Sequence, residues 1–332
     1  MTITRRTLAL AGGSAAVALA LPARSQALAG KLVVYTSQPE KDASQTAVGF
    51  KTLHPGVEVE IFRSGTTEVM GKLAAEFAAG QPRPDILFIA DSVSMEALKR
   101  DIRLEVHAAA KVDGFDSQAY DKDRTYFGTK LITTGIAYNK AAKLAPVSWS
   151  DLMQPELKGQ ISMPSPLYSG AAAITLGVIA KRTDLGWKFF EALKSNETIA
   201  VRGNGAVLRS VAIGEKPYGI LVDFMAFNAK AQGSPVEFVA PKEGLTAVTE
   251  PVAILKTAQN KPAARAFIDY LLSDEGQKLA LSQGYLAART AVGRPAWLPA
   301  GQTLPLMPMD IESVLATTEA DKKRFADMFG SA

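Results

Sequence analysis

Three small or polar residues, Ser169, Gly170 and Ala171, follow a short polar loop and begin an Ala-rich run that predicts a helix. The first backbone N–H groups of a helix have no intrahelical partner, and the helix dipole is positive at that end. Such a helix start can bind a phosphate or a carboxylate, so these residues are candidates for anion binding. The local pattern also fits a simpler role, in which Ser169 only caps the helix.

A second polar helix start, formed by Ser64, Gly65 and Thr66, follows a predicted strand. Ser37 directly follows the predicted strand 31–36, and Asp91 lies shortly after the predicted strand 84–89, so three successive strand ends are polar. In parallel sheets, ligands bind beyond the carboxyl ends of the strands, and loop residues of this kind are often functional. The alternative is that Thr66 only caps its helix.

Two charged residues near predicted strand and helix ends have alternative roles. Asp223 follows the predicted strand 218–222 and could accept an ammonium or hydroxyl group of a ligand, or could cap the next helix. Arg209, in the predicted helix 206–213, could pair with a phosphate or remain solvated. Asp91 and Asp223 together could instead bind a cation.

Few residues in the chain are suited to catalysis. The chain contains no cysteine, which excludes disulfides and thiolate chemistry. Its two histidines, His54 and His107, have no histidine partner at metal-ligand spacing, and we interpret both as surface or turn residues. No Gly-x-Ser-x-Gly elbow supports a Ser-His-Asp triad. We therefore expect neither an enzyme nor a metal site, although a secreted α/β hydrolase remains the alternative of another class.

The N-terminus predicts an export signal. Arg5 and Arg6 precede an apolar run at 8–21 that is too short to span a bilayer, and small residues allow cleavage near Ala27 or Ala29. We interpret residues 1–27 as a signal peptide and expect the mature chain in the periplasm. The paired arginines resemble a twin-arginine signal, although an ordinary secretion signal can also contain them.

Cleavage of this signal changes the charge of the chain. The formal net charge falls from +4 to +1, because three arginines leave and no acid does. The basic character therefore belongs mainly to the signal, and neither nucleic acid nor an anionic membrane is expected as a partner.

The elements that position these residues form two groups of alternating strands and helices. The first group comprises the predicted segments 31–36, 40–53, 57–62, 67–79, 84–89 and 92–100. The second comprises 160–163, 171–181, 184–195, 206–213, 218–222 and 236–239. This alternation predicts an α/β fold with parallel sheets, and the length of the mature chain predicts two lobes.

Two extended segments, 130–139 and 245–253, are too apolar for flexible linkers and predict a hinge between the lobes. We expect lobe 1 to comprise residues 28–133 and 251–300, and lobe 2 to comprise residues 134–250. We expect residues 301–332 to be a helical C-terminal segment, which the sequence assigns to neither lobe.

The order of several short motifs resembles the bacterial extracellular solute-binding proteins of ABC importers. These motifs are Val33-Val34-Tyr35-Thr36-Ser37, Pro84-Asp85-Ile86-Leu87, the stretch from Trp149-Ser150-Asp151-Leu152 to Ser169-Gly170-Ala171, the stretch from Phe267 to Gln277, and Gly284-Tyr285 with Arg289. The resemblance is to the group that includes binders of ferric iron, thiamine, polyamines, sugar phosphates and aminoethylphosphonate.

The resemblance implies a two-lobe type II periplasmic binding protein fold that closes around one small-molecule solute. It also implies docking to an ABC-importer membrane permease and no catalysis. We expect a monomer without a cofactor.

Differences from the iron-binding members reduce the range of ligands that we expect. By position, the two adjacent iron-binding tyrosines fall at Phe224 and Met225, and the usual histidine and glutamate ligands fall at Pro39 and Ala90. None of these four side chains suits Fe³⁺, which prefers phenolate and carboxylate oxygen. We therefore predict that the chain does not bind ferric iron directly.

The anion-binding part of the family site is retained. In iron-binding members the helix start at Ser169-Gly170-Ala171 holds a synergistic anion, and an asparagine near Asn204 assists. We therefore predict an anionic organic solute, with a phosphate ester or phosphonate favoured over a carboxylate, polyamine or thiamine-type solute. The predicted ligand-binding residues are Ser37, Ser64, Gly65, Thr66, Ser169, Gly170, Ala171, Asn204 and Asp223.

Overall fold

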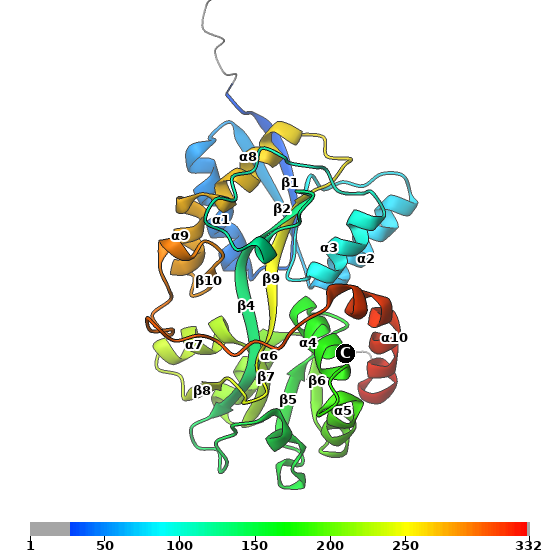
Figure 1. Ribbon diagram of the computed structural model, residues 1–332, viewed down its shortest axis with the longest axis vertical. Helices are drawn as coiled ribbons and strands as arrows, with labels where there is room; N and C mark the ends of the chain where they lie inside the picture. The colour runs from blue at the N-terminus through cyan, green and yellow to red at the C-terminus, as the bar shows by residue number, and fades with distance from the viewer. Residues whose placement is uncertain (1–26, 331–332) are drawn as a thin grey trace, which may run out of the picture.

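The computed structural model describes residues 27–330, so the predicted signal peptide lies outside the described residues except for Ala27. Two groups of strands and helices, which we call lobe 1 and lobe 2, lie one above the other in Figure 1. Two long strands, β4 (Tyr126–Asn139) and β9 (Thr246–Ile254), run between them. The predicted lobe limits at 133/134 and 250/251 fall inside these strands and remain a proposal.

Lobe 1 contains a parallel unit in which β1 pairs with β2 and with β3, as the alternating pattern predicts. Its elements are β1 (Gly30–Thr36), α1 (Glu40–Leu53), β2 (Val57–Arg63), α2 (Thr66–Ala78), β3 (Ile86–Phe88), α3 (Ser92–Arg100), η1 (Ser117–Ala119), α8 (Lys261–Leu272), α9 (Asp274–Ser282), β10 (Leu286–Ala287) and η4 (Thr290–Val292). Apolar residues at helical spacing bury one face of α1 and α8, where Phe50 packs edge-on against Phe267.

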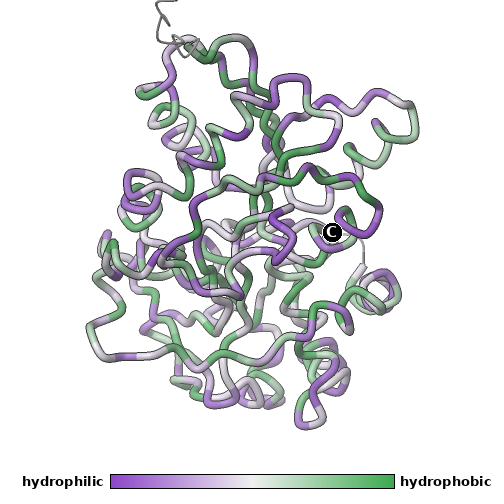
Figure 2. Tube along the Cα trace, turned by 45° about the horizontal axis from the view of Figure 1, so that its top comes forward, coloured by the Kyte–Doolittle hydropathy of each residue, from purple (hydrophilic) through white to green (hydrophobic). Residues whose placement is uncertain are grey.

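Lobe 2 repeats the arrangement, with β5 parallel to β6 and to β7. Its elements are η2 (Trp149–Met153), η3 (Pro155–Leu157), β5 (Ile161–Pro164), α4 (Gly170–Ala180), α5 (Gly186–Ser195), β6 (Ile199–Val201), α6 (Asn204–Ile213), β7 (Tyr218–Val222), α7 (Asp223–Ala231), β8 (Val236–Val239) and α10 (Ile311–Phe329). Outer helices alternate between hydrophilic and hydrophobic residues along the trace, as helices with one buried face do (Figure 2).

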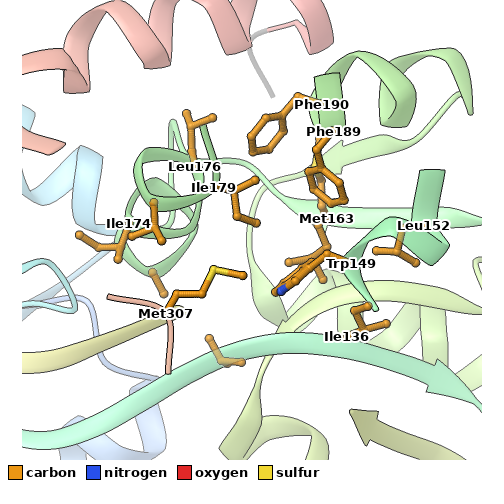
Figure 3. Packing of buried hydrophobic residues seen from close by; sticks show 14 of the residues in the cluster. Ile136, Trp149, Leu152, Met163, Ile174, Leu176, Ile179, Phe189, Phe190 and Met307 are labelled. Atoms are coloured by element: carbon orange, nitrogen blue, oxygen red, sulfur yellow. The ribbon is translucent and has the colours of Figure 1, made fainter. Parts of the chain in front are cut away.

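The core of lobe 2 surrounds Trp149, which is fully buried beside Phe189 (Figure 3). The Trp149 indole Nε1 donates to the carbonyl oxygen of Gly244 at 2.8 Å, so its one polar atom is satisfied. Helix α4 is apolar on all sides and buried along nearly its whole length. These contacts fix the start of α4, at Gly170, on a rigid support.

The two lobes share one continuous sheet with the strand order β2-β1-β3-β9-β4-β7-β5-β6. Strands β4 and β9 pair with each other in antiparallel orientation, and a register shift lies between Gly128 and Leu131. The two predicted hinge segments are therefore hydrogen-bonded neighbours, which lets them bend as one unit.

A third connection, residues 288–310, runs from lobe 1 to lobe 2 and was not expected from the sequence (Figure 1). Its residue Leu306 bridges to Leu245, and Met307 enters the lobe 2 core (Figure 3). Helix α10 follows and buries Val314 and Phe325 in the same core, so it belongs to lobe 2. Between residues 27 and 330, no helix is both long and apolar enough to cross a membrane.

Candidate functional site

A cavity of about 330 Å³ lies between the lobes. Lobe 1 contributes residues that follow the carboxyl ends of β1, β2 and β3, and lobe 2 contributes residues that follow β5, β6 and β7. The hinge strands add Ile132 and Glu250, and Tyr285 lies just before β10. The cavity therefore lies where parallel sheets are expected to bind ligands.

Four helices begin at this cavity. Residues of the first turn of α2, α4, α6 and α7 all line it. The N-cap residues Gly65 of α2, Gly203 of α6 and Val222 of α7 make no side-chain capping hydrogen bond. Their first-turn N–H groups, which have no intrahelical partner, add positive potential to the cavity wall.

Ser169 both caps α4 and lines the cavity. Its Oγ accepts a hydrogen bond from the backbone N–H of Ala172 at 3.3 Å and another from Asn204 Nδ2 at 3.2 Å. The N–H groups of Gly170 and Ala171, the first two residues of α4, have no intrahelical partner. The capping role of Ser169 is thus compatible with an anion at the same helix start.

Three guanidinium groups, of Arg63, Arg202 and Arg209, line the cavity against one carboxylate, that of Glu250. Glu250 is almost fully buried, and its Oε2 lies 2.8 Å from Lys130 Nζ and accepts from Gln38 Nε2 at 3.1 Å. The Glu250 carboxylate is therefore compensated by Lys130, and the Arg202 guanidinium by Glu68, so the charges of Arg63 and Arg209 leave the cavity positive.

The remaining wall is apolar. Ile132, Val222, Phe224 and Met225 line it beside Tyr285, whose ring centroid lies 4.1 Å from that of Phe224. The Tyr285 hydroxyl donates to Asp42 Oδ2 at 2.6 Å, and burial raises the pKa of that phenol well above its usual range.

The lobes touch at the rim of the cavity, so the described state is closed. The Thr67 backbone N–H donates to the carbonyl oxygen of Tyr168 at 3.4 Å, and Arg202 Nη2 lies 2.7 Å from Glu68 Oε1. Glycine permits this approach at two positions: a Cβ on Gly65 would lie 2.6 Å from the Tyr168 carbonyl oxygen, and one on Gly170 would lie 2.7 Å from Thr66 Oγ1.

Most of the predicted ligand-binding residues line this cavity. They are Ser37, Gly65, Thr66, Ser169, Gly170, Ala171 and Asn204. The four residues that stand where iron-binding members have their ligands also line the cavity, namely Pro39, Ala90, Phe224 and Met225. Among residues 27–330, no cluster of His, Cys, Asp and Glu is arranged to hold a metal ion.

Two predicted residues, Ser64 and Asp223, do not line the cavity, and we correct both. The Ser64 hydroxyl donates to Glu68 instead. Asp223 is 1% exposed and turns its carboxylate into the protein, where it accepts from Thr133 Oγ1 at 2.8 Å and from the Phe224 N–H at 2.7 Å. Asp91 also points elsewhere, because it caps α3 through the N–H groups of Val93 and Ser94.

Five further cavity residues were not predicted from the sequence, namely Arg63, Tyr168, Arg202, Glu250 and Tyr285. Arg63 and Arg202 each lie next to a motif already singled out, at the last residue of β2 and directly after β6. Their positions beside these motifs could have indicated both arginines as cavity residues. Glu250 and Tyr285 come from the hinge region, where nothing in the local sequence indicates a cavity.

Comparisons with known proteins agree on the fold. A family model described as "Bacterial extracellular solute-binding protein" matches residues 81–311. An uncharacterized protein of Haemophilus influenzae is 28% identical over 272 residues, which are 77% of this chain and 76% of that protein. The spermidine/putrescine-binding periplasmic protein of Escherichia coli is 30% identical over 152 residues, which are 43% of this chain and 44% of that protein.

Among solved structures, the periplasmic binding protein AfuA from Actinobacillus pleuropneumoniae, with exogenous fructose-6-phosphate bound, superposes with a TM-score of 0.82. The match covers 91% of this chain and 99% of AfuA at 24% identity. At 24% identity, this similarity shows a shared fold and no more than that.

Proposed function

This chain belongs to the family of bacterial extracellular solute-binding proteins, and from that premise we propose that it is the periplasmic solute-binding component of an ABC importer. In this proposal, the lobes close around a small anionic organic solute, for which a phosphate ester or a phosphonate is favoured. The protein delivers the solute to a membrane permease without changing it chemically.

The observation that most supports an anionic solute is the excess of donors over acceptors around the cavity. Four helix starts and three guanidinium groups line it. Arg202 is paired with Glu68 and the one cavity carboxylate, Glu250, with Lys130, which leaves the charges of Arg63 and Arg209 uncompensated. A phosphate or phosphonate group can accept hydrogen bonds from several N–H groups at once and is stabilised by the positive helix ends.

A polyamine is the main alternative, because relatives with spermidine/putrescine-binding names match part of the chain. A polyamine carries several ammonium groups, and each needs acceptors such as uncompensated carboxylates. Asp91 and Asp223, the two acids that could have provided them, both point away from the cavity and satisfy backbone N–H groups.

The experiment is a thermal-shift and calorimetric screen of the purified mature chain. The ligands are phosphate esters, phosphonates, citrate, thiamine and spermidine. A ligand at about 100 times its Kd should stabilise the protein by about 2.7 kcal/mol. A shift with phosphates or phosphonates supports the proposal, whereas a shift with spermidine or thiamine alone contradicts it.

Two controls test the remaining parts of the proposal. Mass spectrometry of the ligand after incubation should recover it unchanged, and a hydrolysis product would favour the secreted hydrolase instead. Light scattering should give the mass of a monomer, and cell fractionation should place the mature chain in the periplasm.

A further inference from the structure

The walls of the cavity differ in chemistry, and that difference bears on the organic part of the solute. We propose that the cavity selects an anion attached to a compact apolar, preferably planar, group and discriminates against polyhydroxylated sugar phosphates of the same charge. The inference rests on the proposed function, because it assumes that an anionic group occupies the helix starts.

The anion-facing wall consists mainly of the first turns of α2, α4 and α6 together with the arginines. An apolar part of the lining is formed by Ile132, Val222, Phe224 and Met225. None of these four side chains can donate a hydrogen bond, and the Met225 thioether is only a weak acceptor. Met225 extends towards α6, where its Cε would lie 4.0 Å from a Cβ placed on Gly205.

Tyr285 adds a ring rather than a hydroxyl to this wall. Its hydroxyl donates to the buried carboxylate of Asp42 at 2.6 Å, so it is not free to bind a ligand. Lys130 Nζ lies 4.1 Å from the centroid of the Tyr285 ring, and Phe224 packs against the same ring. These contacts hold Tyr285 and Phe224 in place as an aromatic surface at the cavity.

The apolar wall offers no free side-chain oxygen to ligand hydroxyl groups, because its one side-chain oxygen, that of Tyr285, is bonded to Asp42. Glu250 Oε2 is already held by Lys130 and Gln38. Asn204 Oδ1 is a buried atom without a hydrogen-bond partner among the described residues, but it belongs to the first turn of α6 on the anion-facing wall. A sugar phosphate has several hydroxyls, and those pressed against the apolar wall would lose hydrogen bonds to water without replacement.

A flat apolar group avoids that loss and gains contact area. It can pack against the Phe224 and Tyr285 rings in offset or edge-on geometry, with the thioether of Met225 as an adaptable neighbour. The cavity volume of about 330 Å³ is at the small end for ligand sites, which favours one compact group beside the anion.

The test compares phenyl phosphate, fructose-6-phosphate and inorganic phosphate by calorimetry on the mature chain. We expect phenyl phosphate to bind at least about tenfold more tightly than fructose-6-phosphate, because only the sugar loses unreplaced hydrogen bonds. In Met225→Gln, the affinity for phenyl phosphate should fall about fivefold while that for inorganic phosphate stays unchanged, because only the apolar wall is altered. Met153→Gln, at a half-buried lobe 2 position away from the cavity, should change neither affinity.

Failure of this inference and failure of the proposed function would give different results. Tighter binding of fructose-6-phosphate than of phenyl phosphate would overturn this inference and leave the proposed function standing. Binding of spermidine but of no phosphate or phosphonate would overturn both. If Met225→Gln does not fold, the ligand comparison on the unaltered chain still decides the matter, and Phe224→Leu provides a second variant that keeps the wall apolar but removes the ring.

Discussion

Arg209 is the residue whose charge offers the most direct test of anion binding. It lies on α6 at the cavity, and no carboxylate lies within ion-pair distance of it between residues 27 and 330. Arg209→Gln removes that charge, and charge-assisted hydrogen bonds lost in this way should weaken binding of a phosphate ester about tenfold. Calorimetry measures the change. Arg83→Gln, at an exposed position away from the cavity, is the matched control and should leave the affinity unchanged.

Titration with ferric iron tests whether the cavity can bind a metal although Phe224 and Met225 stand where iron-binding members have tyrosines. Phe224 and Met225 line the cavity but offer no phenolate, and Tyr285 donates its hydroxyl to Asp42. Titration of the ligand-free protein with ferric citrate should therefore produce no visible tyrosinate charge-transfer band. Such a band would require Tyr168, the other cavity tyrosine, to bind the metal and would contradict the prediction.

Asp223 should make stability depend on pH. Burial raises the pKa of its carboxyl from 3.8 to about 7, although hydrogen bonds from Thr133 and Phe224 oppose the shift. Between about pH 4 and 7, the folded state binds this proton more tightly than the unfolded state does, so stability falls as pH rises. Burial also raises the pKa of Asp91, which acts in the same direction.

The variant Asp223→Asn should flatten this dependence, because an amide does not titrate. Urea unfolding at pH 5.5, 6.5 and 7.5 measures how the free energy of unfolding depends on pH. The unaltered chain should lose stability over the range, and the variant should lose less. An equal loss in both proteins would show that Asp223 does not titrate in this range.

The sequence predicted the polar residues of the site better than the charged ones. Gly65, Ser169 and Asn204 could be placed because parallel strands end at one edge of a sheet, and a helix start needs little tertiary information. The direction of a long or buried side chain depends on its neighbours instead. Asp223 was wrongly placed for that reason, and so was His107, which is 5% exposed and bonds Asp269.

At the scale of elements, the start of α4 must pass close to lobe 1 when the lobes close. Gly170→Ala would place a Cβ 2.7 Å from Thr66 Oγ1 in the closed state only. We expect the variant to bind its solute at least about tenfold more weakly with unchanged ligand-free stability, because alanine is tolerated in a helix and the open state avoids the clash.

For Gly170→Ala, calorimetry measures the affinity for the solute, and thermal unfolding measures the ligand-free stability. Gly71→Ala, within α2, is the control, because a Cβ there meets nothing within 4 Å. It should bind normally and be more stable by about 1 kcal/mol, the helix propensity difference. Normal binding by Gly170→Ala would show that closure does not require this approach.

Most elements could be predicted because their patterns are strong. Helices α1 and α3 begin and end at the predicted residues, and β7 does as well. Helix α6 begins at Asn204, two residues before the predicted start at 206. The pairing of β4 with β9 could not be predicted, because two segments more than 100 residues apart reveal no register.

At the scale of the whole molecule, the third connection makes lobe 2 a composite of distant segments. Helix α10 contributes Phe325 to the lobe 2 core, and its Glu312 pairs with Arg100 of α3 in lobe 1. The amphipathic pattern of 301–332 predicted a helix but not its location, because many apolar grooves fit such a helix. Its position depends on Leu306 and Met307, which anchor the preceding segment.

Closure of the whole molecule can be tested through the ion pair across the cleft between Arg202 and Glu68. Both side chains are largely exposed, so the pair should contribute less than about 1 kcal/mol to the closed state. Glu68→Arg replaces attraction with repulsion and should weaken solute binding about two- to fivefold, more at low salt than at high salt.

The double variant Glu68→Arg with Arg202→Glu restores opposite charges across the cleft and separates two roles of Arg202. If Arg202 acts only in closure, the double variant should recover the original affinity. If its guanidinium also contacts the anion, affinity should stay low while small-angle scattering of the saturated protein again reports the compact state. A double variant no more compact than Glu68→Arg would contradict the assignment of this pair to closure.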